Sequence, residues 1–311
     1  MNGRSKPITA LAAVLCAIPI ISVLLMPGGC SDDRFTEPMV LGGVEVSAEV
    51  LNRGRENYII YCRACHGING DGNGPAARGL RPAPRDFRLG MIKYASVSAE
   101  YLPPDSDFYR IIKNGLHGTA MLRWDISDER LHTIIQYIKT FSERWTDEYE
   151  EVGESIVIPE DPFIGREAEA IEEGRRIYHG VAQCWSCHPA YAEREFIRRV
   201  TAEMTGREIT EFRPNLYEPE LRNTDYGFKI LPLDFLYHDL RAGSSPEDLF
   251  RTIAVGIAGT AMPTWHGSIP DEQIWAMTRY VKSLTELKDT PDGWRLKADL
   301  ASQPAFSPPE N

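Results

Sequence analysis

Apolar side chains recur at helical spacing in two distant segments of the chain. In each segment they fall on one face of a helix; they are Leu131, Ile134, Ile135, Ile138 and Phe141 in the first, and Ile274, Met277, Val281 and Leu284 in the second. This spacing predicts two amphipathic helices that each cover a core. Ser127 and Pro270, each followed by two acidic residues, predict where these helices begin.

Two further helices are predicted upstream, over "LNRGRENYIIYC" at residues 51–62 and "IEEGRRIYHGVAQC" at residues 171–184. Each contains a glycine at a comparable place, Gly54 and Gly174. Because a glycine inside a helix costs about 1 kcal/mol relative to alanine, its presence in both helices indicates close contact with another helix. Strand-like alternation is weak throughout, so the predicted fold class is all-α.

An internal repeat organises the chain. The segment "DFYRIIKNGLHGTAMLRW" at residues 107–124 returns as "DLFRTIAVGIAGTAMPTW" at residues 248–265, without insertion or deletion. Such self-similarity indicates a tandem duplication. We therefore predict two domains and three flanking segments: a first domain at 45–145, an acidic linker at 146–165, a second domain at 166–288, a flexible tail at 289–311, and an N-terminal segment at 1–30.

The N-terminal segment differs from the rest of the chain. Two basic residues precede an almost uninterrupted apolar run from Pro7 to Met26, and Cys30 follows two glycines. This order is typical of an export signal, and Cys30 lies where bacterial lipoproteins carry their lipidated cysteine. We predict a signal peptide at residues 1–30 with lipidation at Cys30, which attaches the protein to a membrane facing the periplasm or the cell surface of a bacterium. The alternatives are simple secretion and an uncleaved anchor, because the run approaches the roughly 20 residues needed to cross a bilayer.

The charge of the chain is strongly negative. Its 311 residues carry 34 basic and 45 acidic side chains, a net charge of −11. Without residues 1–29, which hold two basic side chains and no acidic one, 32 basic face 45 acidic side chains and the net charge is −13. Nucleic acid is a poor partner for such a chain, and a basic protein surface is a better one. The same composition also fits an acidic surface that only keeps the protein soluble.

Four of the six cysteines lie in two C-x-x-C-H motifs, "CRACH" at residues 62–66 and "CWSCH" at residues 184–188. The other two lie in the N-terminal segment, so no cysteine is left for a conventional disulfide framework. Paired cysteines serve structural zinc sites, redox-active dithiols and covalently attached haems. Zinc leaves the adjacent histidines and the repeated "GTAM" unexplained, and a thioredoxin-like dithiol needs an α/β fold that the patterns do not predict.

A c-type haem uses every residue of the motif. The two cysteines form thioether bonds to the haem vinyl groups, and the histidine that follows binds the iron. A methionine in a glycine-containing loop is a suitable sixth ligand, because its thioether is soft and neutral and favours ferrous iron. Met121 and Met262 occupy equivalent places in the repeat. His117 competes in the first copy, but the second copy has Ala258 there, so the repeat favours methionine in both.

These residues resemble those of class I cytochromes c. The resemblance rests on Cys62, Cys65, His66 and Met121 in the first copy and on Cys184, Cys187, His188 and Met262 in the second. It implies a dihaem protein with two covalently bound haem c groups, one per domain. The four cysteines would form the thioethers, and His66 with Met121 and His188 with Met262 would be the axial ligands of the two irons.

The resemblance also implies further haem contacts. In this family a proline carbonyl accepts a hydrogen bond from the ligand histidine, and Pro75 matches that position, with Pro214 as its counterpart in the second copy. The other contacts come from the repeat: Trp124 and Trp265 are expected near the haem edges, and Arg110 and Arg251 are expected to pair with haem propionates.

The second copy is longer than the first. His66 and Met121 are 55 positions apart (121 − 66), whereas His188 and Met262 are 74 apart (262 − 188). The difference lies in an insertion at residues 189–231. It covers the second haem, forms a docking surface, or is a loop of no special role.

Electron transfer is the function that two six-coordinate haems support, because no substrate reaches an iron whose axial positions are both filled. We predict a non-enzymatic carrier that relays single electrons between a donor and an acceptor redox protein in a periplasmic or cell-surface respiratory chain. Two alternatives are open. One is a cytochrome subunit permanently docked in a respiratory complex, such as a haem-copper oxidase or a quinol-oxidising complex; the other is a dihaem peroxidase-like enzyme with one displaceable ligand.

Overall fold

The computed structural model describes residues 35–304 and residue 306. The predicted all-α fold is confirmed, because the strands in this part of the chain are limited to one short hairpin. The predicted signal peptide and Cys30 lie outside the described residues. Among the described helices, none combines the length and the apolar character needed to cross a bilayer.

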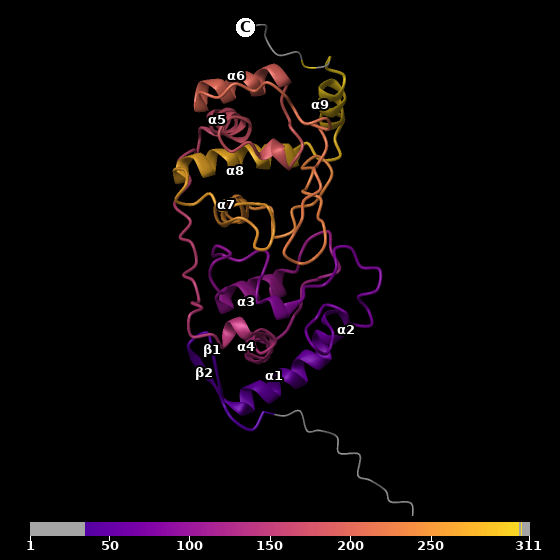
Figure 1. The fold of residues 1–311 in the computed structure, drawn as a ribbon, viewed down its shortest axis with the longest axis vertical. Coiled ribbons are helices and arrows are strands. Elements are labelled where there is room, and N and C mark those ends of the chain that lie inside the picture. Colours follow the sequence, from indigo (N-terminus) through magenta and orange to yellow (C-terminus); the bar gives the residue numbers. More distant parts are fainter. Residues whose placement is uncertain (1–34, 305, 307–311) are drawn as a thin grey trace, which may run out of the picture. The chain divides into compact units, whose positions relative to one another are not determined.

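The first half of the described chain folds around its own hydrophobic core. Its elements are β1 (Met39–Leu41), β2 (Val44–Val46), α1 (Ala48–Tyr61), α2 (Arg63–His66), the 3-10 turn η1 (Phe87–Leu89), α3 (Asp105–Asn114), α4 (Asp128–Lys139) and the 3-10 turn η2 (Glu143–Trp145) (Figure 1). Helix α4 begins directly after Ser127, as predicted, and its four apolar residues are buried; Phe141 lies just beyond its end.

The second half repeats this plan around a second core. Its elements are α5 (Glu167–His179), the 3-10 turn η3 (Cys184–Ser186), α6 (Arg194–Thr205), α7 (Pro246–Val255), α8 (Asp271–Glu286) and α9 (Pro291–Ala301). Helices α5, α7 and α8 correspond to α1, α3 and α4. The apolar residues predicted for α8 are all buried.

The two glycines of the opening helices lie where helices cross. Gly54 of α1 packs against the backbone carbonyl of Thr133 in α4, and Gly174 of α5 packs against that of Ala276 in α8. A Cβ atom at either glycine would overlap the facing carbonyl oxygen, so the two main chains approach more closely than a side chain allows. The prediction of close helix contact at both glycines is confirmed.

The segment between the two halves is held by both of them. The backbone N–H of Ile156 donates to the carbonyl of Ser96 in the first half (2.8 Å). Five residues later, Asp161 forms an ion pair with Arg279 of α8 in the second half. The predicted linker at residues 146–165 is therefore an ordered connection and not a free tether.

The prediction of a flexible tail at residues 289–311 is wrong for residues 291–301, which form α9. Leu300 of this helix is buried in the second core, and Lys297 lies 2.7 Å from the carboxylate of Asp234. The prediction of a flexible tail rested on the proline-rich end of the sequence. The sequence does carry start signals for this helix, because the Thr290 side chain caps α9 and Pro291 occupies its first turn.

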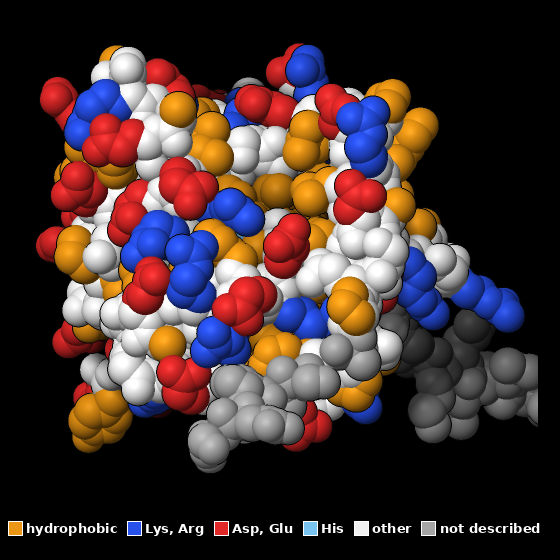
Figure 2. All heavy atoms as spheres, turned by 90° about the horizontal axis from the view of Figure 1, so that it is seen from above, with side chains coloured by type: hydrophobic (Ala, Val, Ile, Leu, Met, Phe, Trp, Pro, Cys, Tyr) orange, Lys and Arg blue, Asp and Glu red, His pale blue; other side chains and the backbone are white. Residues whose placement is uncertain are grey.

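The insertion at residues 189–231 belongs to the second core. Its helix α6 buries Ile197, and the loop that follows buries Phe212 and Leu216. Figure 2 shows the end of the molecule where α6 lies, with acidic and basic side chains interspersed over it. The insertion is therefore part of the second core, its outer surface has mixed charge, and Arg222 and Lys229 near its end line a cavity that both C-x-x-C-H motifs also line.

Candidate functional site

One cavity of about 1150 Å³ extends through both halves. Both C-x-x-C-H motifs and both downstream methionines line it; these residues are Cys62, Cys65, His66, Met121, Cys184, Cys187, His188 and Met262. None of these four cysteines is in a disulfide. Many of the other lining residues are apolar, among them Ile112, Ile134 and Ile253. The residues predicted to hold two haems thus share one continuous space.

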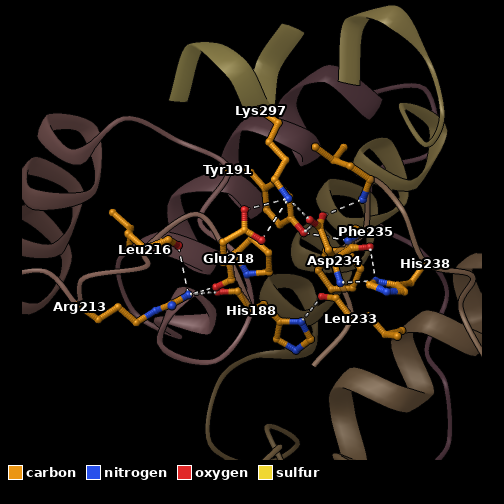
Figure 3. Close-up of polar contacts among 12 residues, drawn as sticks. His188, Tyr191, Arg213, Leu216, Glu218, Leu233, Asp234, Phe235, His238 and Lys297 are labelled. Atoms are coloured by element: carbon orange, nitrogen blue, oxygen red, sulfur yellow. Dashed lines mark hydrogen bonds and ion pairs between the residues drawn. The ribbon is translucent and has the colours of Figure 1, made fainter. Parts of the chain in front are cut away.

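The two motif histidines are oriented in the same way. Nδ1 of His66 lies 3.0 Å from the carbonyl oxygen of Arg85, and Nδ1 of His188 lies 2.9 Å from that of Leu233 (Figure 3). Since a carbonyl only accepts, each Nδ1 carries the proton and each Nε2 keeps its lone pair. Burial lowers the pKa of both imidazoles and keeps them neutral. A neutral imidazole with a free Nε2 is the form that binds iron.

The hydrogen bonds predicted for the carbonyls of Pro75 and Pro214 are not formed, because Arg85 and Leu233 accept them instead. Neither proline lines the cavity. A second repeat carried the signal that we missed: "PRDF" at 84–87 and "PLDF" at 232–235. In both copies, the residue after the proline supplies the carbonyl.

The same short repeat places an aromatic ring against each histidine. Phe87 stacks on His66 with ring centroids 4.5 Å apart, and Phe235 stacks on His188 at 5.1 Å. The aspartate before each phenylalanine accepts a hydrogen bond from the backbone N–H two residues later, which closes the turn. Each imidazole is thus fixed by a carbonyl at its edge and by a ring on its face.

The surroundings of the cysteines oppose the zinc and dithiol alternatives. Burial raises the pKa of the Cys62 and Cys184 thiols to about 12, whereas a redox-active dithiol needs a lowered pKa. Within residues 35–304, no group of three or more His, Cys, Asp or Glu side chains is arranged to hold a metal ion, as a structural zinc site would be.

The two methionines come from loops of the same design. The backbone N–H of Met121 donates to Oγ1 of Thr119 (3.0 Å), and that of Met262 donates to Oγ1 of Thr260 (3.2 Å). Each threonine thereby folds the loop back so that the methionine lines the cavity. His117 is exposed and does not line it. The structure brings Met121 to the site, and not its competitor.

The remaining predicted contacts divide into two groups. Trp124 and Trp265 line the cavity. Arg110 and Arg251 do not; each forms an ion pair with the aspartate three residues before it in the same helix, at 2.5 Å and 2.8 Å. The prediction that these arginines pair with haem propionates is wrong, because each already has a carboxylate partner on its own helix.

The charged residues that line the cavity are all basic. They are Arg81, Arg85, Lys93, Arg222, Lys229 and Arg241, and no aspartate or glutamate of the described chain joins them. This sign is the reverse of the overall charge of −11. A haem presents two carboxylates on an otherwise apolar ring, so an apolar cavity with basic groups fits it. We missed these residues because they lie outside the repeat of residues 107–124 and 248–265. Around the second repeat, Arg81 and Lys229 hold equivalent places, and so do Lys93 and Arg241.

One arginine organises the loop around His188. Arg213 donates hydrogen bonds to backbone carbonyls on both sides of that loop: those of Trp185 (2.9 Å), His188 (2.9 Å), Leu216 (3.1 Å) and Glu218 (2.6 Å). Several of these bonds are visible in Figure 3. The corresponding loop of the first half is rich in glycine and has no such arginine. The insertion therefore brings its own means of fixing the backbone next to the second histidine.

Comparisons with known proteins agree with this geometry. The family model described as "Cytochrome C oxidase, cbb3-type, subunit III" matches residues 49–138 and, again, residues 169–281. No curated protein matches the chain significantly in sequence. Among solved structures, a chain of the Kuenenia stuttgartiensis reducing HAO-like protein complex is similar, with 30% identity and a TM-score of 0.60, over 75% of this chain and 95% of that chain. Each family match contains one C-x-x-C-H motif and its downstream methionine, and the chain therefore belongs to this family of c-type cytochromes.

Proposed function

We propose that the chain is a dihaem c-type cytochrome that relays single electrons between a donor and an acceptor protein. The observation that carries this proposal is the single cavity, because it is lined by two complete sets of haem-binding residues. Each half would hold one haem c through its two cysteines. Bound there, each haem supplies one-electron chemistry between ferric and ferrous iron.

The residues of the chain favour transfer over catalysis. Each half would offer one imidazole and one thioether to a haem iron, and with both bound no substrate would reach it. The thioether of Met121 or Met262 favours the ferrous state, while the fixed imidazoles of His66 and His188 resist reorganisation. The chain would thus tune two potentials and exclude water.

The proposed location is outside the cytoplasm, on a membrane of a bacterium. The sequence of residues 1–30 supports export, and Cys30 supports a lipid anchor. Mass spectrometry of the N-terminal peptide from the native protein would test this part. A diacylglyceryl group on Cys30 is expected; an unmodified mature N-terminus or an intact residue 1–30 segment would contradict it.

A second candidate is a subunit that stays docked in a larger complex. Two observations favour it: the matching family model is named for an oxidase subunit, and the similar solved chain comes from a protein complex. That chain is covered over 95% of its length, so the likeness extends beyond a single haem motif. Mild-detergent purification from the native source distinguishes the two candidates. If partner subunits co-purify in a fixed stoichiometry, the protein is a docked subunit and not a free carrier.

Optical spectroscopy of the purified mature protein tests the chemistry. We expect two haems per chain, a methionine-to-iron charge-transfer band from each ferric haem, and no binding of carbon monoxide to the ferrous protein. Uptake of carbon monoxide by one haem that also lacks the band would mean a vacant or labile ligand position. That result would refute the electron-carrier function in favour of an enzyme or a ligand-switching protein.

A further inference from the structure

A group of basic side chains lies where the two halves of the cavity meet. The Arg85 guanidinium, from the first half, lies 3.9 Å from the ring centroid of Tyr226, from the second half. Lys93 Nζ lies 5.1 Å from the same ring. Arg241, in the second half, accepts a backbone hydrogen bond from His117 in the first (2.9 Å). All three basic residues also line the cavity, so both halves contribute to one cationic group.

This group has no acidic partner among the described residues. Asp86, next to Arg85 in the sequence, forms its ion pair with Arg88, although its charge also acts on Arg85. Burial, together with the charges of Arg85 and Arg241, lowers the pKa of Lys93 to about 8. Three like charges at a half-buried junction are unfavourable unless an anion compensates them. The arrangement therefore points to an anionic ligand.

The position of the group indicates which anion it binds. The same cavity is lined by both haem-attachment motifs, and its other residues offer no carboxylate. We propose that Arg85, Lys93 and Arg241 form one carboxylate-binding site that is filled by haem propionates from both halves. This proposal rests on the proposed dihaem function. Haem attachment then joins the two halves, because it supplies the negative charge that their junction lacks.

Infrared difference spectroscopy of the holoprotein, with ¹³C in the haem carboxylates, tests this proposal. The variants are Arg85→Gln, Lys93→Gln and Arg241→Gln. The control is Arg78→Gln, because Arg78 is exposed and does not line the cavity. In the three variants, we expect the ¹³C-carboxylate bands of the reduced-minus-oxidised spectrum to shift and the amide of His117 to exchange hydrogen about 10-fold faster or more. In the control, neither should change.

Three outcomes would overturn the proposal. The labelled bands could stay fixed in all variants, or they could move equally in the control. Alternatively, added phosphate or chloride could change the labelled bands and the His117 exchange of the wild-type holoprotein, which would identify a free anion as the ligand. Should Arg241→Gln fail to fold, Arg241→Lys keeps the charge and is expected to keep the wild-type bands. Haem content is measured separately, so a chain with fewer than two haems would refute the dihaem function without being mistaken for an empty carboxylate site.

Discussion

The imidazole of His179 is fully buried in the second half, away from the cavity. Its Nδ1 donates to the carbonyl of Arg175 (2.7 Å), and its Nε2 accepts from the backbone N–H of Tyr191 (3.2 Å). The second bond requires the neutral ring, because a protonated Nε2 has no lone pair with which to accept, and burial lowers the pKa of His179 from 6.5 to about 3. His179 is thus a structural residue whose protonation would break a buried contact.

We predict that His179 makes the folded state sensitive to acid. Because the pKa is lower in the folded than in the unfolded chain, the unfolded chain binds the proton first, and stability falls as the pH decreases from about 6.5 toward 3. His179→Gln keeps a neutral hydrogen-bonding side chain and should reduce this pH dependence. Urea unfolding at several pH values measures it. An unchanged slope of unfolding free energy against pH would contradict the prediction.

A second prediction concerns Arg213. Its replacement by glutamine removes the donor for several partly buried carbonyls around His188, each of which is costly to leave unsatisfied. In Arg213→Gln, hydrogen exchange at residues 184–190 and 214–218 should accelerate about 10-fold or more, while residues 62–75 exchange as before. Arg207→Gln, at an exposed arginine of the same insertion, is the control. Equal effects in the two variants would refute the role of Arg213.

At the scale of residues, the sequence revealed chemistry that depends on side-chain type. Cys62, His66 and Met121 could be identified because few other side chains form thioethers or bind iron. Arg85 and Leu233 were harder to identify, because a backbone carbonyl is available from any residue and only the repeat of "PRDF" and "PLDF" marks their place. The same reasoning explains the wrong prediction for Arg110, since the sequence does not show that its charge is already compensated by Asp107.

At the scale of elements, the two helix crossings give a matched pair of variants. A methyl group at Gly54 or Gly174 would overlap a backbone carbonyl, which cannot move without displacing its helix. We predict that Gly54→Ala and Gly174→Ala each destabilise the fold by about 1–3 kcal/mol despite the higher helix propensity of alanine. Thermal unfolding of the holoprotein measures this.

The control for the glycine variants is Glu56→Ala, at an exposed position of the same helix α1. Its effect should stay within about 0.5 kcal/mol. If the glycine variants were as stable as this control, the helices would not need the close approach seen in the structure.

Helices with a regular apolar face were predictable, and those without one were not. α4 and α8 pack along one long stripe, so their periodicity is clear in the sequence. α9 contributes mainly Leu300 to the core and is otherwise held by polar contacts such as that of Lys297 with Asp234. Such contacts form only when the rest of the second half is folded. The sequence therefore offers only the start signals at Thr290 and Pro291, without an apolar stripe behind them.

At the scale of the whole molecule, charge should govern encounters with partners. The net charge of −11 gives a long-range attraction to basic proteins. We predict that the rate of electron exchange with a basic redox protein falls several-fold between about 0.05 and 0.5 M salt, where screening becomes effective within a few ångströms. Stopped-flow reduction measures this, with an uncharged reductant as the control. Salt-independent rates with the basic partner would show that the net charge plays no part in docking.

The ordered segment between the halves also has a consequence for synthesis. The chain emerges N-terminus first, at roughly 5–20 residues per second, so Ile156 becomes available to Ser96 before α8 exists. The first half can close over this segment while the second is still being made. Asp161 lies five residues after Ile156, so it would already be close to the finished half when its partner Arg279 emerges.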